Sequence, residues 1–549
     1  MKFHRFGTVA VAALLATAAH AQQGKDNLAT MQQMKVATTD LNIPVVPQAG
    51  KNADAIRNNL KKIKPAPLGL ASEAARIQAA NYEDDLGLLA ECDLIIEAIA
   101  ERMDWKRDLY AKVAPHIAPQ AIVASNTSGL SITELSQALP DALRSRFCGI
   151  HFFNPPRYMA LVELIATPST DPAILDQLET FATSTLGKGV VRAKDTPNFI
   201  ANRVGIAGLL ATMTEAQKFG LPVDVVDDLT GKKMGRASSG TFRTADVVGL
   251  DTMAHVINTL QTTLSLQTDP FYGNFGTPEV LQGLVKAGAL GQKTKAGFYK
   301  KEGKTILRLD PATQQYVPST GKADPLVERI LKKPPAERLK LLRESSNPQA
   351  QFVWAILRDG FHYAAVHLQT IAETARDVDF ALRWGFGMKQ GPFELWQEAG
   401  WLQVAQWIQD DIQSGKALCA APLPAWVFEG PVAQAGGVHT ADGSYSPASG
   451  RFVGLSSLPV YTRQLFRETV KGSPGPDPLK SGTELFRNEE LRAWTLDGDI
   501  VIASITAKLH LISPTVTEGL LKAVEIAEGA YKGLVIWSPD EVFSAGANL

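Results

Sequence analysis

Cysteine is scarce in this sequence, with three residues among 549: Cys92, Cys148 and Cys419. They are too few and too scattered for a disulfide framework, and no CxxC pair suggests zinc, so we expect no metal site. An excess of charge of one sign is also lacking, because 55 Lys and Arg stand against 56 Asp and Glu, a formal net charge of −1. The chain therefore has no global basic field that would hold nucleic acid or an anionic membrane.

Apolar runs long enough to span a bilayer are absent as well. The longest, from Phe6 to Ala19, falls short of the roughly 20 residues that a membrane-spanning helix needs. It follows the basic residues Lys2 and Arg5 and runs into Ala19-His20-Ala21, a small-x-small cleavage pattern. This pattern predicts a secretory signal over 1–21, with a buried Ala-rich helix as the alternative.

What the sequence does contain, from residue 42 to 194, is an alternation of short apolar strands and amphipathic helices. Cys92–Ala100, Ala121–Ala124 and Phe147–Phe153 are apolar runs of the buried, parallel type. Around Asp195-Thr196-Pro197 the pattern changes, and this string predicts the start of a long helix. Mainly helical sequence follows to about residue 300.

Two groups of polar residues stand at the ends of these strands. Ser125-Asn126-Thr127-Ser128 follows a buried strand, at the edge of a sheet where ligands bind, although a plain polar turn is an equally good interpretation. His151 ends the next strand, and Glu163 follows twelve residues later in Leu-Val-Glu-Leu. A carboxylate beside a His orients the imidazole for proton transfer, but a pair so spaced is more often incidental.

A third candidate is Asn202, one turn into the predicted helix, which could hold a substrate oxygen or be a surface polar residue. Taken together, SNTSGLSIT, GIHFFNPP with LVELI, and KDTPNFIANR resemble, in this order and spacing, the 3-hydroxyacyl-CoA dehydrogenases of fatty-acid β-oxidation. The resemblance runs from about residue 42 to 300 and continues more weakly toward the carboxyl end. It implies NAD as cofactor and oxidation of (3S)-3-hydroxyacyl-CoA to 3-oxoacyl-CoA.

The resemblance also implies a role for each matched residue. His151 is the base that takes the 3-hydroxyl proton, and Glu163 stabilises its imidazolium. Ser128 and Asn202 hold the substrate oxygen. The cofactor-binding residues that the resemblance implies are Glu101, Lys106, Ser128 and Lys293. It further implies an acyl-CoA substrate, a cytoplasmic location (periplasmic if the signal is genuine) and room for a homodimer.

The helical region shows an internal repeat. Sliding residues 197–250 forward by 151 places Pro197 on Pro348, Asp228 on Asp379, Gly240 on Gly391, Phe242 on Phe393 and Gly249 on Gly400. The same shift puts Val353 where Asn202 stood. We therefore expect a second helical copy that packs against the first and lacks its polar contact.

Near the carboxyl end, a further α/β unit resembles the opening of a crotonase-fold enoyl-CoA hydratase. Its Phe543–Leu549 string resembles the turn that offers a backbone N–H to the thioester oxygen, with Asn548 in place of the usual acid. The second oxyanion donor and both catalytic glutamates of that family are missing from the sequence. We therefore expect no hydratase activity, and a CoA-ester lyase fragment is disfavoured.

These observations give an α/β fold class: an incomplete Rossmann-like parallel sheet, then duplicated all-α dehydrogenase C-terminal domains and a partial crotonase-like α/β unit. The expected boundaries are a signal-like segment (1–21), a linker (22–41), an incomplete NAD-binding Rossmann domain (42–194), a helical C-terminal domain (195–300), a linker (301–345), a second helical domain (346–410), a linker (411–490) and a truncated crotonase-like unit (491–549).

One departure from the family pattern bears on the cofactor. No GxGxxG occurs in residues 1–60, and the strand Ile43–Val46 runs into Pro47 without the acidic residue that binds the ribose. The half of the pocket that holds ADP-ribose is therefore expected to be missing. This leaves two hypotheses: a 3-hydroxyacyl-CoA dehydrogenase impaired in NAD affinity, or a non-catalytic acyl-CoA-binding protein or scaffold.

Overall fold

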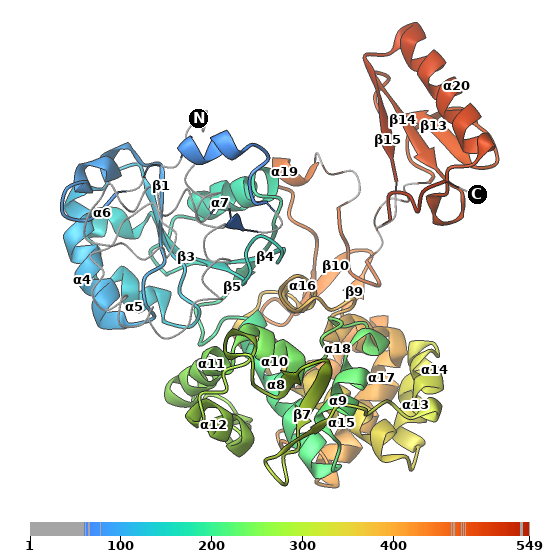
Figure 1. Cartoon of the computed structure of the whole chain (residues 1–549). Coiled ribbons are helices and arrows are strands. Elements are labelled where there is room, and N and C mark those ends of the chain that lie inside the picture. Colours follow the sequence, from blue (N-terminus) through green and yellow to red (C-terminus); the bar gives the residue numbers. More distant parts are fainter. Residues whose placement is uncertain are drawn as a thin grey trace. The chain divides into compact units, whose positions relative to one another are not determined.

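The computed structural model of the chain (Figure 1) describes residues 60–547, except 61, 64–65, 77, 79, 463, 465–466, 474, 476, 478 and 539–541. The predicted signal and first linker, and the strand near Ile43, lie outside the described residues. Among the described ones, no helix combines the length and apolar character needed to cross a bilayer. The chain forms two compact units, one reaching Val460 and including Val470–Ser473, the other holding Tyr461–Thr469 and the chain from Pro474 onward.

The first unit begins with a five-stranded sheet in the order β1-β2-β3-β4-β5. Its strands are β1 (Leu94–Glu97), β2 (Ile122–Ser125), β3 (Phe147–Phe152), β4 (Leu161–Ile165) and β5 (Gly189–Ala193). All pairs are parallel except β3 and β4, which are antiparallel, so the expected all-parallel sheet is corrected to a mixed one. The reason is the short connection 153–160, because a parallel crossover needs about a dozen residues or more.

Helices cover both faces of this sheet. They are α4 (Met103–Val113), α5 (Ile132–Ser136), α6 (Asp141–Arg144) and α7 (Pro172–Ser184), and 3₁₀ turns lie at Ala71–Arg76, Leu86–Glu91 and Ala114–His116. Alternate residues of β2 point to opposite sides: Ile122 packs in the core with α7, whereas Val123 packs in the core with α4 and α5. This two-sided burial explains why β2 reads as a continuous apolar run.

The first helical copy follows the sheet. It contains α8 (Ala201–Lys218), α9 (Val223–Thr230), α10 (Phe242–Val248), α11 (Leu250–Thr263) and α12 (Glu279–Lys286). The second copy contains α15 (Pro348–Ile371), α16 (Ala375–Phe386) and α17 (Pro392–Gln413). The predicted repeat is confirmed by a backbone feature: Gly249, between α10 and α11, has φ 102°, and Gly400, at the kink within α17, has φ 103°.

The repeat is not gapless, however. Asp227 accepts hydrogen bonds from the backbone N–H groups of Thr241 (2.7 Å) and Phe242 (2.6 Å) at the start of α10. Asp379 does the same for Phe393 (2.9 Å) at the start of α17. The counterpart of Asp379 is therefore Asp227 and not Asp228, because a one-residue shift in the loop separates the capping acid from the helix it caps.

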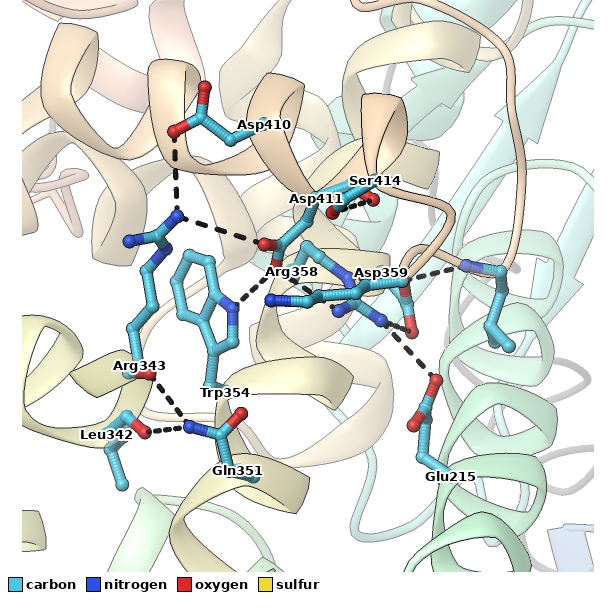
Figure 2. A network of polar contacts seen from close by, with 12 residues as sticks. Glu215, Leu342, Arg343, Gln351, Trp354, Arg358, Asp359, Asp410, Asp411 and Ser414 are labelled. Carbon is cyan, nitrogen blue, oxygen red and sulfur yellow. Dashed lines mark hydrogen bonds and ion pairs between the residues drawn. The ribbon is translucent and has the colours of Figure 1, made fainter. Parts of the chain in front are cut away.

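Buried charges join the two copies. Arg358 of α15 pairs with its neighbour Asp359 (3.0 Å), with Asp411 of α17 (3.3 Å) and with Glu215 of α8 (3.4 Å). Figure 2 shows these side chains converging, with the Trp354 indole N–H also donating to Asp411 (2.8 Å). Because Glu215 belongs to the first copy and Arg358 to the second, this network fixes one copy against the other, as expected from the repeat.

Both stretches expected as linkers after residue 300 contain secondary structure. Residues 301–345 and their borders hold β6 (Tyr299–Glu302), β7 (Thr305–Leu309), β8 (Tyr316–Pro318), α13 (Pro325–Leu331) and α14 (Pro335–Glu344). Residues 411–490 hold α18 (Gly430–Ala435), β9 (His439–Thr440), β10 (Gly443–Ser446), β11 (Arg451–Val453), α19 (Pro459–Thr462) and β12 (Thr483–Arg487). The Pro- and Gly-rich sequence thus marks turns between short elements.

The second unit is a four-stranded sheet packed on one long helix. Beside β12 it contains β13 (Leu491–Thr495), β14 (Ile500–Ile505), α20 (Pro514–Ala530) and β15 (Gly533–Trp537), in the order β12-β13-β14-β15. The β14–β15 pair is parallel and is joined by α20, a βαβ crossover as the sequence predicts. Asn548 lies outside the described residues.

Candidate active site

His151 and Glu163 lie opposite each other on neighbouring strands. They are register partners in the antiparallel β3–β4 pair, and His151 Nδ1 lies 2.7 Å from Glu163 Oε2. The side chains are buried, with 4% of His151 and none of Glu163 exposed. A cross-strand pair on one face of a sheet has adjacent Cβ atoms, so the antiparallel register itself creates the contact. The spacing of twelve residues is therefore not incidental.

The other oxygen of Glu163 is held by a helix. Its Oε1 accepts hydrogen bonds from the backbone N–H groups of Ile200 (3.1 Å) and Ala201 (2.9 Å), at the start of α8. A helix N-terminus carries unpaired N–H groups and a partial positive charge, which suit a carboxylate. These two bonds fix the orientation of the carboxylate, so that Oε2 faces the imidazole.

The segment before α8 differs from the helix start that the sequence predicts. The helix begins at Ala201, because Asn198 (φ 60°) and Phe199 (φ 53°) adopt the left-handed conformation. That conformation is uncommon for residues other than Gly, although Asn tolerates it better than most. Phe199 is fully buried, and its ring centre lies 5.5 Å from that of His151. The turn thus aims both the N–H donors at Glu163 and an aromatic ring at His151.

The string Asp195-Thr196-Pro197, which predicts the start of this helix, lies before it, and Asp195 does not cap it. Its carboxylate instead accepts hydrogen bonds from Ser131 Oγ (3.0 Å), Ile132 N (2.9 Å) and Thr133 N (2.8 Å) at the start of α5. The acid therefore ties the segment leading into α8 to the helix that follows the SNTS turn.

The SNTS turn is organised by Glu101, one of the residues expected near the cofactor. Glu101 Oε1 accepts hydrogen bonds from Thr127 Oγ1 (2.5 Å), Ser128 N (2.9 Å) and Gly129 N (3.1 Å). On the same turn, Asn126 Oδ1 accepts the N–H of Phe152 (3.0 Å), the residue after His151. The ends of β1, β2 and β3 are thus bonded together, and Ser128 lies at the edge where they meet.

Lys106 is more deeply buried than a cofactor contact suggests, with no exposed side-chain surface. Its ammonium donates to Glu97 Oε1 (2.7 Å) and lies 4.0 Å from Glu101 Oε2. Glu97 also accepts the hydroxyls of Tyr110 (2.8 Å) and Ser125 (2.7 Å). Sequence reasoning missed Glu97, whose only signal was a carboxylate inside an apolar strand.

Comparison with known proteins places this arrangement in a family. Residues 23–196 match the family described as 3-hydroxyacyl-CoA dehydrogenase, NAD binding domain, and residues 199–301 match 3-hydroxyacyl-CoA dehydrogenase, C-terminal domain. A Deinococcus radiodurans protein named "Probable 3-hydroxyacyl-CoA dehydrogenase" is 41% identical over 266 residues, covering 48% of this chain and 75% of that protein. The chain belongs to the 3-hydroxyacyl-CoA dehydrogenase family. The match begins at residue 23, inside the stretch expected as a linker.

Two further similarities extend beyond this region. A Bacillus subtilis protein of the same printed name is 36% identical over 504 residues, which cover 89% of this chain and 60% of that protein. The chain therefore matches about 60% of the length of this relative. The crystal structure of 3-hydroxybutyryl-CoA dehydrogenase from Escherichia coli aligns with TM-score 0.51 and 21% identity, covering 74% of this chain and 93% of that one, and supports the fold.

The remaining expected site residues of this family member lie at different distances from the pair. Asn202 is the second residue of α8, half-buried and next to Ala201, whose N–H contacts Glu163. Lys293 forms an ion pair with Asp251 at the start of α11. The residue of α11 that approaches the SNTS turn is Thr259, close to the Cα of Gly129. Eight residues of helix, about 12 Å, separate it from Asp251.

The residues at the strand ends fit one half of NAD. Glu101 Oε2 lies 4.0 Å from the Lys106 ammonium, beside Ser128 at the carboxyl ends of β1 and β2. The Glu101 carboxylate as acceptor and the Ser128 hydroxyl as donor at that edge suit the hydroxyls of the nicotinamide ribose, whereas Lys106 is fully buried. For the pyrophosphate, the described residues that precede β1 offer no Gly-rich turn of the GxGxxG type. The fit therefore concerns the nicotinamide half.

Proposed function

We propose that this chain catalyses the NAD-dependent oxidation of (3S)-3-hydroxyacyl-CoA to 3-oxoacyl-CoA, and the reverse reduction, in fatty-acid β-oxidation. The observation that carries the proposal is the buried His151–Glu163 contact of 2.7 Å, fixed by the start of α8 and adjoining the SNTS edge of the sheet. The family membership and the printed names of the relatives support it. They favour a dehydrogenase over the non-catalytic alternative.

Proton transfer is the step that these residues perform. NAD, when bound, would supply the acceptor for the hydride that leaves C3 of the substrate. His151 Nδ1 is engaged with Glu163, so Nε2 is the nitrogen that takes the proton of the 3-hydroxyl. The carboxylate holds the ring in one orientation and stabilises the imidazolium that forms. In the reverse direction the same nitrogen returns the proton to the oxygen.

Other residues position the two reactants. Ser128, at the edge of the SNTS turn, and Asn202, beside the N–H groups that hold Glu163, supply polar groups for the substrate oxygen. Glu101 and Ser128 hold the nicotinamide ribose. Lys106 acts on the cofactor indirectly, because its buried ammonium lies 4.0 Å from the Glu101 carboxylate. Lys293, paired with Asp251, is proposed to contact the cofactor from the side of α11.

The rest of the proposal concerns the setting of the reaction. The proposed substrate is an acyl-CoA, the proposed location is the cytoplasm, with the periplasm as the alternative if the signal is genuine, and the proposed assembly is a homodimer. The second unit contributes a βαβ element, for which we propose no hydratase activity.

The reduction of acetoacetyl-CoA tests the proposal. The reaction is monitored by the loss of NADH absorbance while NADH is titrated to saturation. We expect turnover that requires unusually high NADH, because residues 1–60 contain no GxGxxG sequence. His151→Ala is expected to lower kcat by about 100-fold to 10,000-fold while acetoacetyl-CoA still binds. His255→Ala, on the exposed side of α11, is the matched control and should retain the parent turnover.

Two results would contradict the proposal. If the parent binds acetoacetyl-CoA but gives no turnover at any NADH concentration, the non-catalytic alternative is correct. If His151→Ala retains the parent kcat, another group is the base.

A further inference from the structure

The second helical copy reaches the catalytic sheet. Helix α16 packs against β4, β5 and α8, and glycines allow the approach. A Cβ on Gly205 of α8 would collide with the ring of Phe386, at the end of α16, and a Cβ on Gly189 of β5 would overlap the ring of Trp384. Both aromatic rings therefore lie directly on the backbone of the catalytic half.

Phe386 is connected to the catalytic His by one intervening ring. The ring centres of Phe386 and Phe153 lie 6.4 Å apart in an edge-on arrangement, and those of Phe153 and His151 lie 4.6 Å apart. Phe153 is buried, with 7% of its surface exposed. A Cβ on Gly385, next to Phe386, would lie 3.4 Å from Phe153 Cδ1. Phe153 is thus held between His151 and the end of α16.

The same copy is attached to the segment that precedes the left-handed turn. Ala193, the last residue of β5, forms an antiparallel bridge with Ala372, in the link between α15 and α16. Lys194 donates its backbone N–H to Ile371 O (3.2 Å) and its ammonium to Gln369 O (2.8 Å). The strand that leads into Asn198 and Phe199 therefore ends on the second copy.

We propose that Phe386 is a positioning residue of the dehydrogenase reaction: it holds Phe153 against His151, so that the second helical copy forms a back wall behind His151. The inference rests on the proposed function for the role of His151. Interiors are close-packed, so removing this ring leaves a void that Phe153 fills by moving away from the imidazole. A displacement of about 1 Å at a reacting group lowers turnover steeply.

The central comparison is between Phe386→Ala and Trp384→Ala. Both remove an aromatic ring of α16 that lies on a glycine, but Trp384 stacks on Phe380 (4.2 Å) and covers Gly189 of β5 instead of contacting Phe153. We expect Phe386→Ala to lower kcat about 10-fold or more with KM values changed less than about twofold. Trp384→Ala should lower the melting temperature about as much as Phe386→Ala does, but it should leave kcat within about twofold of the parent value.

Two further variants separate positioning from loss of stability. Phe386→Leu retains most of the volume and should restore most of kcat, which a defect caused by global unfolding does not explain. Gly205→Ala displaces the ring without altering it and should lower kcat while leaving the KM values unchanged. If Trp384→Ala and Phe386→Ala lower kcat equally, or if Phe386→Ala leaves it unchanged, Phe386 is ordinary packing and the inference is wrong.

A readout independent of turnover distinguishes this inference from the proposed function. Carbethoxylation of His151 by diethyl pyrocarbonate, followed by peptide mass spectrometry, reports access to the imidazole. We expect His151 to react faster in Phe386→Ala than in the parent or in Trp384→Ala. If the parent is inactive but shows this labelling pattern, the proposed function is wrong and the inference about Phe386 is supported. Equal labelling in all three proteins would overturn the inference about Phe386.

Discussion

The two helical copies share a scaffold and differ at their first turn. Where Asn198 and Phe199 form a left-handed turn in the first copy, the residues 151 positions later, Gln349 and Ala350, already lie in the regular helix α15. The N–H groups at the start of α8 hold Glu163 of the sheet, whereas Asn347 caps α15 with its own side chain, accepting from Gln349 N (2.9 Å).

The difference lies in the residues that would carry the chemistry. The helices, their capping acids and the positive-φ glycines Gly249 and Gly400 recur in both copies. The sheet carboxylate at the helix start occurs in the first copy alone among the described residues, and the residue that the 151-residue shift pairs with Asn202 is Val353, which is fully buried. In the proposed reaction, proton transfer therefore depends on a two-residue turn and on the two N–H groups that follow it, not on the helical fold that carries them.

Loss of the Glu163 carboxylate, which the start of the first copy holds, should have the largest effect on turnover. Glu163→Gln leaves an amide with one acceptor oxygen and one uncharged NH2 group. The amide therefore cannot both accept from α8 and stabilise the imidazolium. We expect kcat to fall about 100-fold or more. Glu179→Gln, on α7 and paired with Arg192, is the control and should change kcat less than about twofold. Steady-state kinetics with acetoacetyl-CoA measure both, and a normal kcat in Glu163→Gln would remove the basis of the comparison.

Loss of the capping acid of the second copy should affect stability and not turnover. Asp379→Ala strands the N–H groups of Phe393 and Glu394 and the ring of His439, whose Nε2 lies 2.7 Å from the carboxylate. We expect a loss of about 3 kcal/mol in the free energy of unfolding. Urea unfolding followed by tryptophan fluorescence measures it, with Asp442→Ala as an exposed control.

Asn202→Ala and Val353→Ala test the two positions that the 151-residue shift pairs. The first should lower kcat about 10-fold with little change in stability, because Asn202 is half-buried. The second should cost about 2 kcal/mol, because a fully buried side chain loses two methyl groups, and should leave kcat unchanged. If both substitutions affect only stability, Asn202 does not contact the substrate.

The capping acid of the first copy should make stability depend on pH. Burial raises the pKa of Asp227 to about 6, although the Tyr299 hydroxyl and three backbone N–H groups act to lower it. An acid whose pKa is higher in the folded state stabilises the fold below its unfolded pKa of about 3.9, and this stability is lost as pH rises through 6.

From about pH 4.5 to 7, the free energy of unfolding of the parent should therefore fall about 2 kcal/mol more than that of Asp227→Asn. Urea unfolding at both pH values gives this difference. Equal falls in the two proteins would show that Asp227 does not carry the effect.

Substitution of Gly249 or Gly400 should have the smallest effect on the free energy of unfolding, and the two effects should be nearly equal. Gly249 and Gly400 have φ near 102°, where a side chain is strained, so we expect Gly→Ala at either position to cost about 1–2 kcal/mol. Gly249→Ala should cost slightly more, because its Cβ would lie 3.1 Å from Asp251 Oδ1, whereas Gly400 faces open space. Paired urea titrations test whether the copies share this backbone feature energetically.

The family resemblance, and not the spacing alone, singled out the His151–Glu163 pair, whereas a shared offset of landmarks was sufficient for the repeat. The apolar runs around His151 and Glu163 predict strands, and a shared offset of landmarks predicts the second copy. The antiparallel β3–β4 pairing was not predicted, although the short connection 153–160 carried its signal. The one-residue shift at Asp227 was also missed, because a fixed offset cannot register a change in loop length.

The turn at Asn198 and Phe199 could not be predicted for a different reason. A non-Gly residue adopts the left-handed conformation only when tertiary contacts determine it, here Glu163 and the buried ring of Phe199. The burial of Lys106 by Glu97 likewise depends on residues from β1 and α4 meeting in space. Both features belong to the tertiary structure and not to any local pattern.

We propose that the pair held by the first helical copy carries out a dehydrogenase reaction. Mass spectrometry of the product formed from acetoacetyl-CoA and NADH with deuterium at both C4 positions tests this proposal. We expect 3-hydroxybutyryl-CoA with one deuterium at C3 from the parent and from Trp384→Ala, and none above background from His151→Ala. Unlabelled product, or equal labelling by parent and His151→Ala, would contradict it.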